Sequence, residues 1–139
     1  MDLRGKKVLI TGGASGIGLC TAREFAQRRA VPILVDINEV TLERELNELR
    51  SDGYEAYGFT VDITDIEKLR DLAQTLEEQG LSPDLLVNCA GLTLIAHVSA
   101  TTHKDWMSIL DEVSEHLLVP LVVRTGIPHN VFRRLRGLL

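Results

Sequence analysis

The chain has 139 residues, of which 45% are hydrophobic and 25% charged, as is typical of a single globular domain. Its net charge of −5 disfavours a nucleic-acid or membrane-surface binder, and no apolar run approaches the roughly 20 residues of a membrane span. The sequence shows no targeting signal, so we expect a cytoplasmic protein in which Cys20 and Cys89 are free, packed thiols.

Four short apolar runs, each bounded by glycine or polar residues, are predicted as buried β-strands. Segments with apolar residues at helical spacing separate them, which indicates βαβ units and a parallel sheet covered on both faces. We therefore expect an α/β fold, a Rossmann-like doubly wound sheet with the strand order 3-2-1-4 and right-handed crossovers. The strands are expected at 6–10, 31–36, 54–63 and 84–88.

Three helices are predicted between these strands. The second is expected to end near Gly53, and the third to start at Thr64, which forms a capping box with Glu67, and to end at Gly80. The expected apolar faces are Ile17, Cys20, Ala22, Phe25 and Ala26 in the first helix, Val40, Leu42, Leu46 and Leu49 in the second, and Ile66, Leu69, Leu72, Ala73 and Leu76 in the third.

The segment "TGGASGIG" (11–18) holds four glycines between the first strand and the first helix. Glycine lets the main chain turn tightly and approach a ligand, and a helix N-terminus presents N–H groups to an anion. Gly12, Gly16 and Gly18 have the spacing expected at a dinucleotide pyrophosphate. A tight turn without a ligand is the alternative explanation.

Polar residues follow the other strands. Asp36, eighteen residues after Gly18, lies where an acidic side chain binds an adenosine ribose. No Arg or Lys stands in the loop or directly after Asp36 to bind a 2′-phosphate, so NAD is favoured over NADP. Asp36 could instead cap a helix or occupy a solvated turn. Asp62 and Asn88 also follow strands, and Asn88 is equally compatible with a side-chain-to-backbone bond.

Together, "TGGASGIG", Asp36, "VDIT" (61–64) and "NCAG" (88–91) resemble the short-chain dehydrogenase/reductase family, classical type, over residues 5–111. The resemblance implies a nicotinamide cofactor and reversible hydride transfer between an alcohol and a ketone. It places Gly12, Ser15, Ile17 and Gly18 around the pyrophosphate, Asp36 at the adenosine ribose, Asp62 and Ile63 at the adenine, and Asn88, Ala90 and Gly91 beside the nicotinamide.

The residues that perform the family's reaction have no match here. The family uses a tyrosine, a lysine four residues later and a serine, but Tyr54 and Tyr57 are followed at that spacing by Gly58 and Val61. Thr125 is a poor substitute for the serine. We therefore assign no catalytic residue and expect this chain alone to be inactive. The four histidines show no metal-ligand spacing, although His97 follows Gly91 where a substrate would lie.

The last third of the chain shows a less regular pattern. Residues 92–102 are predicted as a loop, and Thr102 with Asp105 as the cap of a helix that continues to about residue 117. Residues 117–123 suit a helix end or a strand, and 127–139 a short amphipathic helix. The tail 112–139 departs from the family pattern, so we treat 1–139 as one incomplete domain and expect a truncated or internally deleted product.

An incomplete sheet would leave the fourth strand as an exposed edge, which could support a homo- or hetero-oligomer. The sequence is compatible with three functions. The chain could be an oxidoreductase by lineage, a catalytically silent dinucleotide-binding module, or an interaction partner of a full-length relative.

Overall fold

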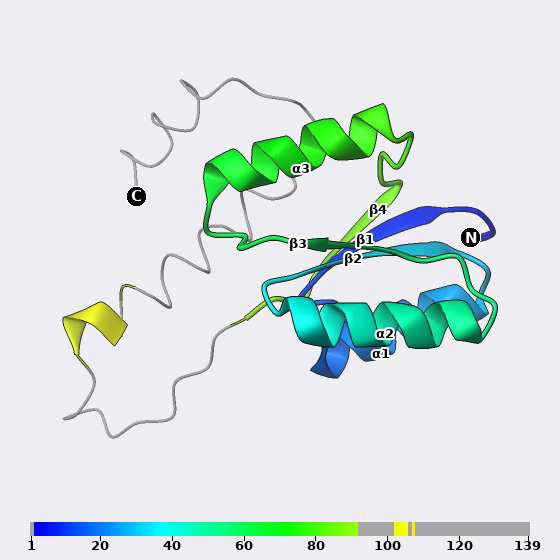
Figure 1. Cartoon of the computed structure of the whole chain (residues 1–139), viewed down its shortest axis with the longest axis horizontal. Coiled ribbons are helices and arrows are strands. Elements are labelled where there is room, and N and C mark those ends of the chain that lie inside the picture. Colours follow the sequence, from blue (N-terminus) through cyan, green and yellow to red (C-terminus); the bar gives the residue numbers. More distant parts are fainter. Residues whose placement is uncertain (1, 92–101, 106, 108–139) are drawn as a thin grey trace.

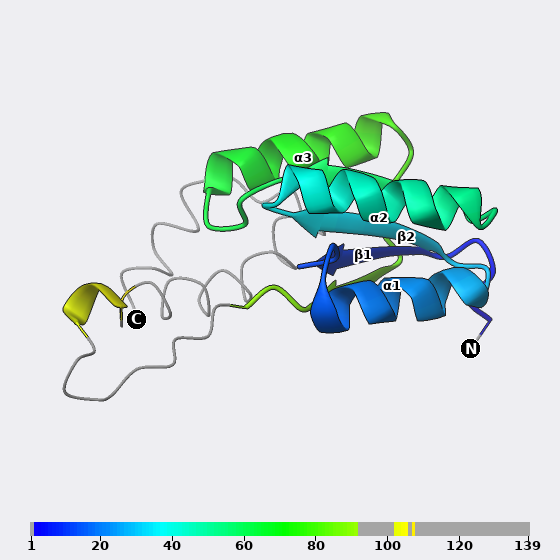
Figure 2. The ribbon, with the colours of Figure 1, turned by 60° about the horizontal axis from the view of Figure 1, so that its bottom comes forward.

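The computed structural model describes residues 2–91, 102–105 and 107. Its centre is a four-stranded parallel sheet with the order β3-β2-β1-β4, as predicted. The chain alternates strand and helix, and α1 and α2 cover one face of the sheet while α3 covers the other (Figure 1 and Figure 2). The elements are β1 (Lys7–Thr11), α1 (Gly16–Gln27), β2 (Val31–Asp36), α2 (Glu39–Ser51), β3 (Tyr57–Thr60), α3 (Ile66–Glu78) and β4 (Leu85–Asn88).

Two hydrophobic clusters hold these layers together, one on each face. Alternate residues of a strand point to opposite faces, so Val8 and Ile10 pack under α1 and α2 whereas Leu9 packs under α3. Both central strands, β1 and β2, are almost entirely buried, as expected for a parallel sheet that is covered on both sides. The third strand is shorter than predicted, four residues rather than the run 54–63.

The buried faces of α1 and α2 differ from the prediction near the starts of these helices. In α1 the buried residues are Gly18, Ala22 and Ala26, whereas Ile17 is 79% exposed and Cys20 is also exposed. In α2 Val40 is 78% exposed. The apolar face of α3 was predicted correctly, with Leu69, Leu72 and Leu76 buried. Both cysteines are free, but only Cys89 packs against the core.

The helix caps are explained by local hydrogen bonds. Asn38 caps α2, where its side chain accepts from the N–H of Thr41. Asp65, not Thr64, caps α3, because its carboxylate accepts from the N–H groups of Glu67 and Lys68. The predicted capping box was therefore wrong by one residue. Gly53 and Gly80 follow the ends of α2 and α3 in the left-handed conformation, at φ 86° and 67°, as their positions predicted.

A salt bridge fixes the beginning of β4 beside β1. Lys6 Nζ lies 2.8 Å from Asp84 Oδ1, and the N–H of Lys7 donates to the other carboxylate oxygen at 2.9 Å. These bonds, that from Lys6 above all, lower the pKa of Asp84, and the same ion pair raises the pKa of Lys6. The pair therefore stabilises the edge strand in its observed register.

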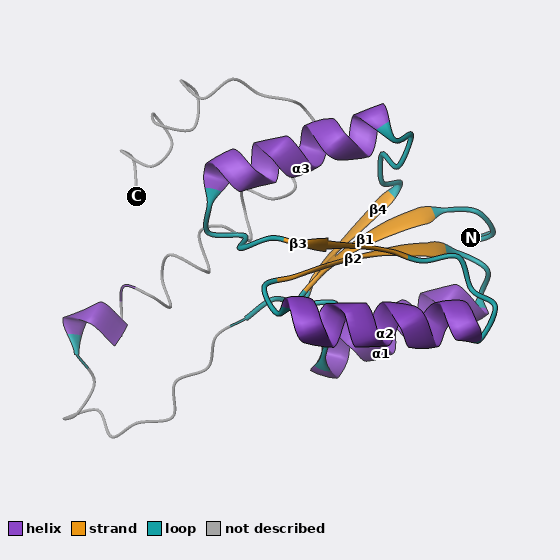
Figure 3. Cartoon of the chain, viewed as in Figure 1, coloured by secondary structure: helices purple, strands orange, loops and turns teal. Residues whose placement is uncertain are grey.

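Beyond Gly91 the structure describes only a short helical turn (Figure 3). Thr102 and Asp105 cap each other there, as predicted: the N–H of Thr102 donates to the Asp105 carboxylate at 2.7 Å, and the N–H of Asp105 donates to Thr102 Oγ1 at 3.2 Å. The remainder of this predicted helix, the loop with His97, and the tail 112–139 lie outside the described residues. In the part of the chain that the structure describes, no helix is long and apolar enough to cross a membrane.

Candidate functional site

The polar residues singled out in the sequence lie at one edge of the sheet. Because the four strands are parallel, their carboxyl ends meet there, with Thr11 paired with Asn88 on one side and Asp36 paired with Thr60 on the other. The glycine loop follows Thr11 at this edge and leads into α1. This is the edge at which open α/β sheets bind their ligands.

The loop lies directly against the end of β4. Gly12 has φ 62°, a left-handed conformation that glycine adopts without strain. A Cβ at Gly12 would lie 2.8 Å from both the N and the Cα of Ala90, closer than real side chains approach backbone. Gly12 is therefore required by packing as well as by conformation, and no larger residue fits between the loop and β4.

The first turn of α1 packs on the same loop. A Cβ at Gly18 would collide with the carbonyl oxygen of Gly12, so Gly18 brings the helix close to the loop rather than to the strand itself. Gly16, at φ 49°, has open space on the side where a Cβ would stand. The helix therefore starts immediately beside the loop, at the carboxyl edge of the sheet.

The N-terminus of α1 lacks the caps that α2 and α3 have. Ser15 occupies the N-cap position, but its side chain makes no capping hydrogen bond, and the first turn contains no acidic residue. The N–H groups of a helix's first residues have no partner within the helix; in α1 these belong to Gly16, Ile17 and Gly18. These groups and the helix dipole suit an anion such as a pyrophosphate.

Asp36 connects three segments at this edge. Its Oδ2 accepts from the N–H of Ala14 in the glycine loop at 3.0 Å, and its Oδ1 accepts from the N–H of Asn38 at 3.0 Å. Its backbone carbonyl accepts from the N–H of Val61, beyond β3. The carboxylate is thus held in one orientation and keeps lone pairs for further donors, since each oxygen can accept two hydrogen bonds.

Thr11 is a residue of this site that the sequence reasoning did not single out. It is fully buried, and its Oγ1 accepts from the N–H groups of Cys89 and Ala90 at 3.1 and 3.2 Å. A hydroxyl therefore joins the end of β1 to the residues that follow β4. A threonine at the end of an otherwise apolar strand was the available signal.

The two residues predicted at an adenine have different environments. Asp62 is half-buried and accepts from both the N–H and the hydroxyl of Thr64, so it closes a tight turn after β3. The side chain of Ile63 is buried in the cluster under α3. Ile63 could therefore border a ligand with its backbone, while Ile37, which is 66% exposed beside Asp36, presents an apolar side chain to solvent.

The predicted nicotinamide side lies at the other flank of the loop. Asn88 is the last residue of β4, and its side chain is exposed at the carboxyl edge. Ala90 contacts Gly12 closely enough to exclude a larger residue there. Gly91 has open space where a Cβ would stand. Asn88, Ala90 and Gly91 thus lie beside the loop, on the side opposite to Asp36.

Neither tyrosine lies at this edge. Tyr57 begins β3, at the amino edge of the sheet, and its hydroxyl donates to Glu55 at 2.9 Å. That hydrogen bond raises the pKa of Tyr57 above its ordinary value, whereas a tyrosine that exchanges a proton near neutral pH requires a lowered pKa. Tyr54 packs against the core under α2.

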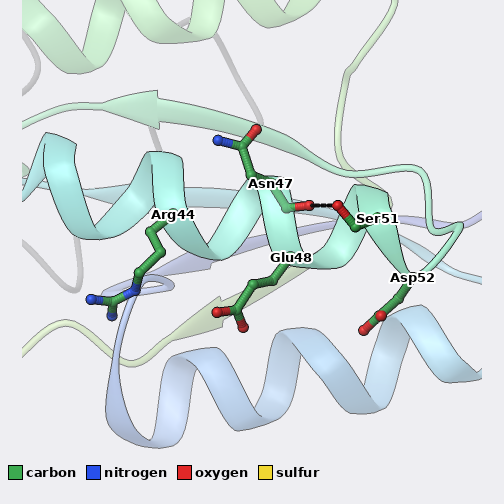
Figure 4. Close-up of a pocket in the computed structure, with 5 residues that line it drawn as sticks. All are labelled: Arg44, Asn47, Glu48, Ser51 and Asp52. Atoms are coloured by element: carbon green, nitrogen blue, oxygen red, sulfur yellow. Dashed lines mark hydrogen bonds between the residues drawn. The ribbon is translucent and has the colours of Figure 1, made fainter.

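A surface hollow on α2 lies away from the glycine loop. Figure 4 shows Glu48 pointing toward α1, while the Ser51 hydroxyl donates to the carbonyl of Asn47. The side chains that line this hollow are exposed and include both acidic and basic groups. The hollow is lined by Arg44, Asn47, Glu48, Ser51 and Asp52. Within residues 2–91, 102–105 and 107, no cluster of three or more His, Cys, Asp or Glu is placed to hold a metal ion.

The strand order and the glycine loop define a Rossmann-like domain, and comparisons with known proteins agree. The family model of the short chain dehydrogenases matches residues 6–114. The chain is 31% identical to the C alpha-dehydrogenase of Sphingobium sp. strain SYK-6, over 94% of this chain and 45% of that protein. It is 37% identical to mouse estradiol 17-beta-dehydrogenase 11, over 72% of this chain and 34% of that protein.

Solved structures show the same relationship. The citronellol catabolism dehydrogenase AtuB of Pseudomonas aeruginosa superposes with a TM-score of 0.80 at 31% identity, covering 88% of this chain and 50% of that one. The chain therefore belongs to the short-chain dehydrogenase/reductase family, whose members use NAD(P) cofactors. It spans less than half the length of the two curated relatives described above.

Proposed function

We propose that this chain binds a nicotinamide dinucleotide at the glycine loop, prefers NAD to NADP, and transfers no hydride by itself. The observation that carries this proposal is the uncapped start of α1 directly beside the carboxylate of Asp36. The helix start suits the pyrophosphate of a dinucleotide, and the acid at the end of the neighbouring strand suits the hydroxyls of its adenosine ribose. Cytoplasm remains the proposed location.

The preference for NAD rests on charge. The carboxylate of Asp36 can accept hydrogen bonds from the ribose hydroxyls of NAD, whereas it would repel the 2′-phosphate of NADP. The loop 11–18 and the residues directly after Asp36 contain no Lys or Arg that could neutralise that phosphate. We therefore expect NADH to bind at least about tenfold more tightly than NADPH, which corresponds to about 1.4 kcal/mol.

The two rings of the dinucleotide would lie on opposite sides of the loop. We assign exposed Ile37, and Ile63 in the turn that Asp62 closes with Thr64, to the border of the adenine together with Asp62. Asn88, Ala90 and Gly91 are proposed to border the nicotinamide. The glycine contacts fit this assignment, because Gly12 leaves no side chain between the loop and the end of β4.

The absence of turnover is proposed from the residues that hydride transfer requires. The family reaction needs a group that exchanges a proton with the alcohol or carbonyl oxygen. The 139 residues contain no tyrosine followed four positions later by lysine, and Tyr57 lies at the wrong edge with a raised pKa. The lineage is that of oxidoreductases, and this chain supplies the cofactor-binding part of the reaction.

A second candidate function is association with a full-length relative through β4. This strand pairs only with β1 among the described residues, so its other edge offers backbone groups to a further strand. Its residues Leu85–Val87 are half-buried rather than covered. Such pairing is compatible with cofactor binding, and it would be the sole function if no dinucleotide bound.

Calorimetric titration of the purified chain with NADH and with NADPH tests the proposal, together with an assay of NADH oxidation with a panel of ketones. Saturable NADH binding, weaker NADPH binding and no oxidation above background are expected. Equal affinity would contradict the assigned role of Asp36, and oxidation would contradict the proposed inactivity. If the chain bound neither dinucleotide, association through β4 would remain as the candidate function, and sedimentation with a full-length relative would detect it.

A further inference from the structure

We propose that Asp36 is a positioning residue for the glycine loop as well as the expected partner of the ribose. The argument begins with its hydrogen bonds. Asp36 Oδ2 accepts from the N–H of Ala14, twenty-two residues earlier in the chain, and Oδ1 accepts from the N–H of Asn38. A carboxylate that accepts two backbone N–H groups fixes both segments relative to each other.

The hydrogen bond between Ala14 and Asp36 is part-buried, and its donor belongs to a buried residue. Ala14 is 1% exposed and belongs to the cluster under α1 and α2. A buried N–H that loses its acceptor costs the full desolvation of that group, so the loop must shift or admit water when the carboxylate is removed. Among the described residues, one further hydrogen bond joins this loop to β2, from the N–H of Gly13 to the carbonyl of Val35, at the longer distance of 3.2 Å.

The position of the loop decides where the N–H groups of α1 point. Ala14 is followed by the N-cap Ser15 and then by the helix start at Gly16. A loop released from Asp36 would therefore present Gly16, Ile17 and Gly18 to a pyrophosphate less well. Asp36 thus contributes to pyrophosphate binding without touching it. This inference deepens the proposed function, because it assigns one carboxylate a part in both halves of dinucleotide binding.

Amide hydrogen exchange of the ligand-free chain tests the positioning role directly. With Asp36→Ala, the Ala14 amide should exchange about tenfold faster or more, while the amides of β1 and β2 keep their protection. Asp62→Ala is the matched control, because it removes an aspartate at the next strand end whose bonds stay within its own turn. Unchanged exchange at Ala14 in Asp36→Ala would overturn the inference.

Asp36→Asn provides a second variant if Asp36→Ala does not fold. Asparagine keeps one acceptor oxygen, so exchange should rise at either Ala14 or Asn38 and stay low at the other. Full protection of both amides would contradict the inference. A general loss of stability would instead speed exchange throughout the sheet, which separates positioning from a merely structural effect.

Binding separates the two roles of the carboxylate. An NADH analogue with a 2′,3′-dideoxy adenosine ribose offers Asp36 no hydroxyl. If Asp36 positions the loop, Asp36→Ala should still weaken this analogue several-fold; an unchanged affinity would show that Asp36 acts on the ribose alone and overturn the inference. If the wild-type chain bound no dinucleotide, the proposed function would fail, while the exchange measurement would still decide the loop's dependence on Asp36.

Discussion

The hydroxyl of Thr11 accepts the backbone N–H of Ala90, and the same oxygen accepts from Cys89, which joins the end of β1 to the residues after β4. Gly12 follows Thr11, and because it has no side chain, the backbone of Ala90 packs closely against it. The glycine loop and the "NCAG" segment are therefore one packed unit. The proposed cofactor-binding edge therefore depends on contacts that run across the sheet.

Replacement of Thr11 by valine should destabilise the chain. Valine keeps the shape but removes the acceptor for two N–H groups, so the free energy of unfolding should fall by about 1–3 kcal/mol. Thr11→Ser, which retains the hydroxyl, is the matched control and should lose less. Urea denaturation of the three proteins measures the difference; equal stability of the two variants would contradict the role of the hydroxyl.

Gly18→Ala should be destabilising because its Cβ has no room beside the carbonyl of Gly12. Overpacking of this kind typically costs about 1–3 kcal/mol of unfolding free energy. Gly91→Ala, where a Cβ meets open space, should change stability by no more than about 0.5 kcal/mol. Thermal unfolding compares the pair. A Gly18→Ala chain as stable as the control would refute the close packing of α1 on the loop.

A buried acid joins α1 to α2. Glu45 is 4% exposed, and its carboxylate accepts from Arg23 of α1 at 2.8 Å and from Arg44 at 2.7 Å. Arg23→Ala should reduce the free energy of unfolding by about 1–2 kcal/mol, because Glu45 keeps Arg44 and Arg23 itself is about half exposed. Urea denaturation measures this loss.

Arg28→Ala is the control on the same helix. Arg28 pairs with Glu24 at 3.4 Å on the surface, and an exposed pair of this type contributes about 0.5 kcal/mol or less. If both variants lost the same stability, the Arg23–Glu45 pair would have no special role in fixing α2 against α1.

The Lys6–Asp84 pair predicts a pH dependence. The pKa of Asp84 is lowered in the folded state, chiefly by Lys6, so its stabilising effect is present above the unfolded pKa and is lost as pH falls through the folded pKa. Asp84→Asn should therefore be less stable than the wild type near pH 7, and the gap should narrow in acid. Melting temperatures across the acid range test this; a gap independent of pH would contradict it.

The sequence was sufficient to predict the sheet order, three helices and the glycine loop, because these depend on local periodicity and on turn residues. It was misleading where a helix begins. Ile17, Cys20 and Val40 fit helical spacing, yet their side chains are exposed, because spacing alone does not fix which side of the first turns faces the sheet. The cap of α3 is Asp65 rather than the predicted Thr64, because the carboxylate of Asp65 reaches two N–H groups.

The contacts that unite the site could not be predicted from spacing. The bond between Asp36 and Ala14 and the bonds from Cys89 and Ala90 to Thr11 join residues far apart in the chain. Glu45 was overlooked because an acid within an apolar helix pattern is ordinarily a surface residue. These features depend on how the elements pack, which only the three-dimensional structure specifies.

Calorimetric titration with NADH of the wild-type chain and of Gly18→Asp tests the central claim most directly. An aspartate at this position would both collide with the loop and place a negative charge at the start of α1. Gly80→Asp, which adds the same charge after α3, is the control; a side chain meets no atoms there, and aspartate tolerates the left-handed φ of 67° better than most residues. We predict saturable binding to the wild type and to Gly80→Asp and none to Gly18→Asp; equal binding by all three would contradict a dinucleotide site at the glycine loop.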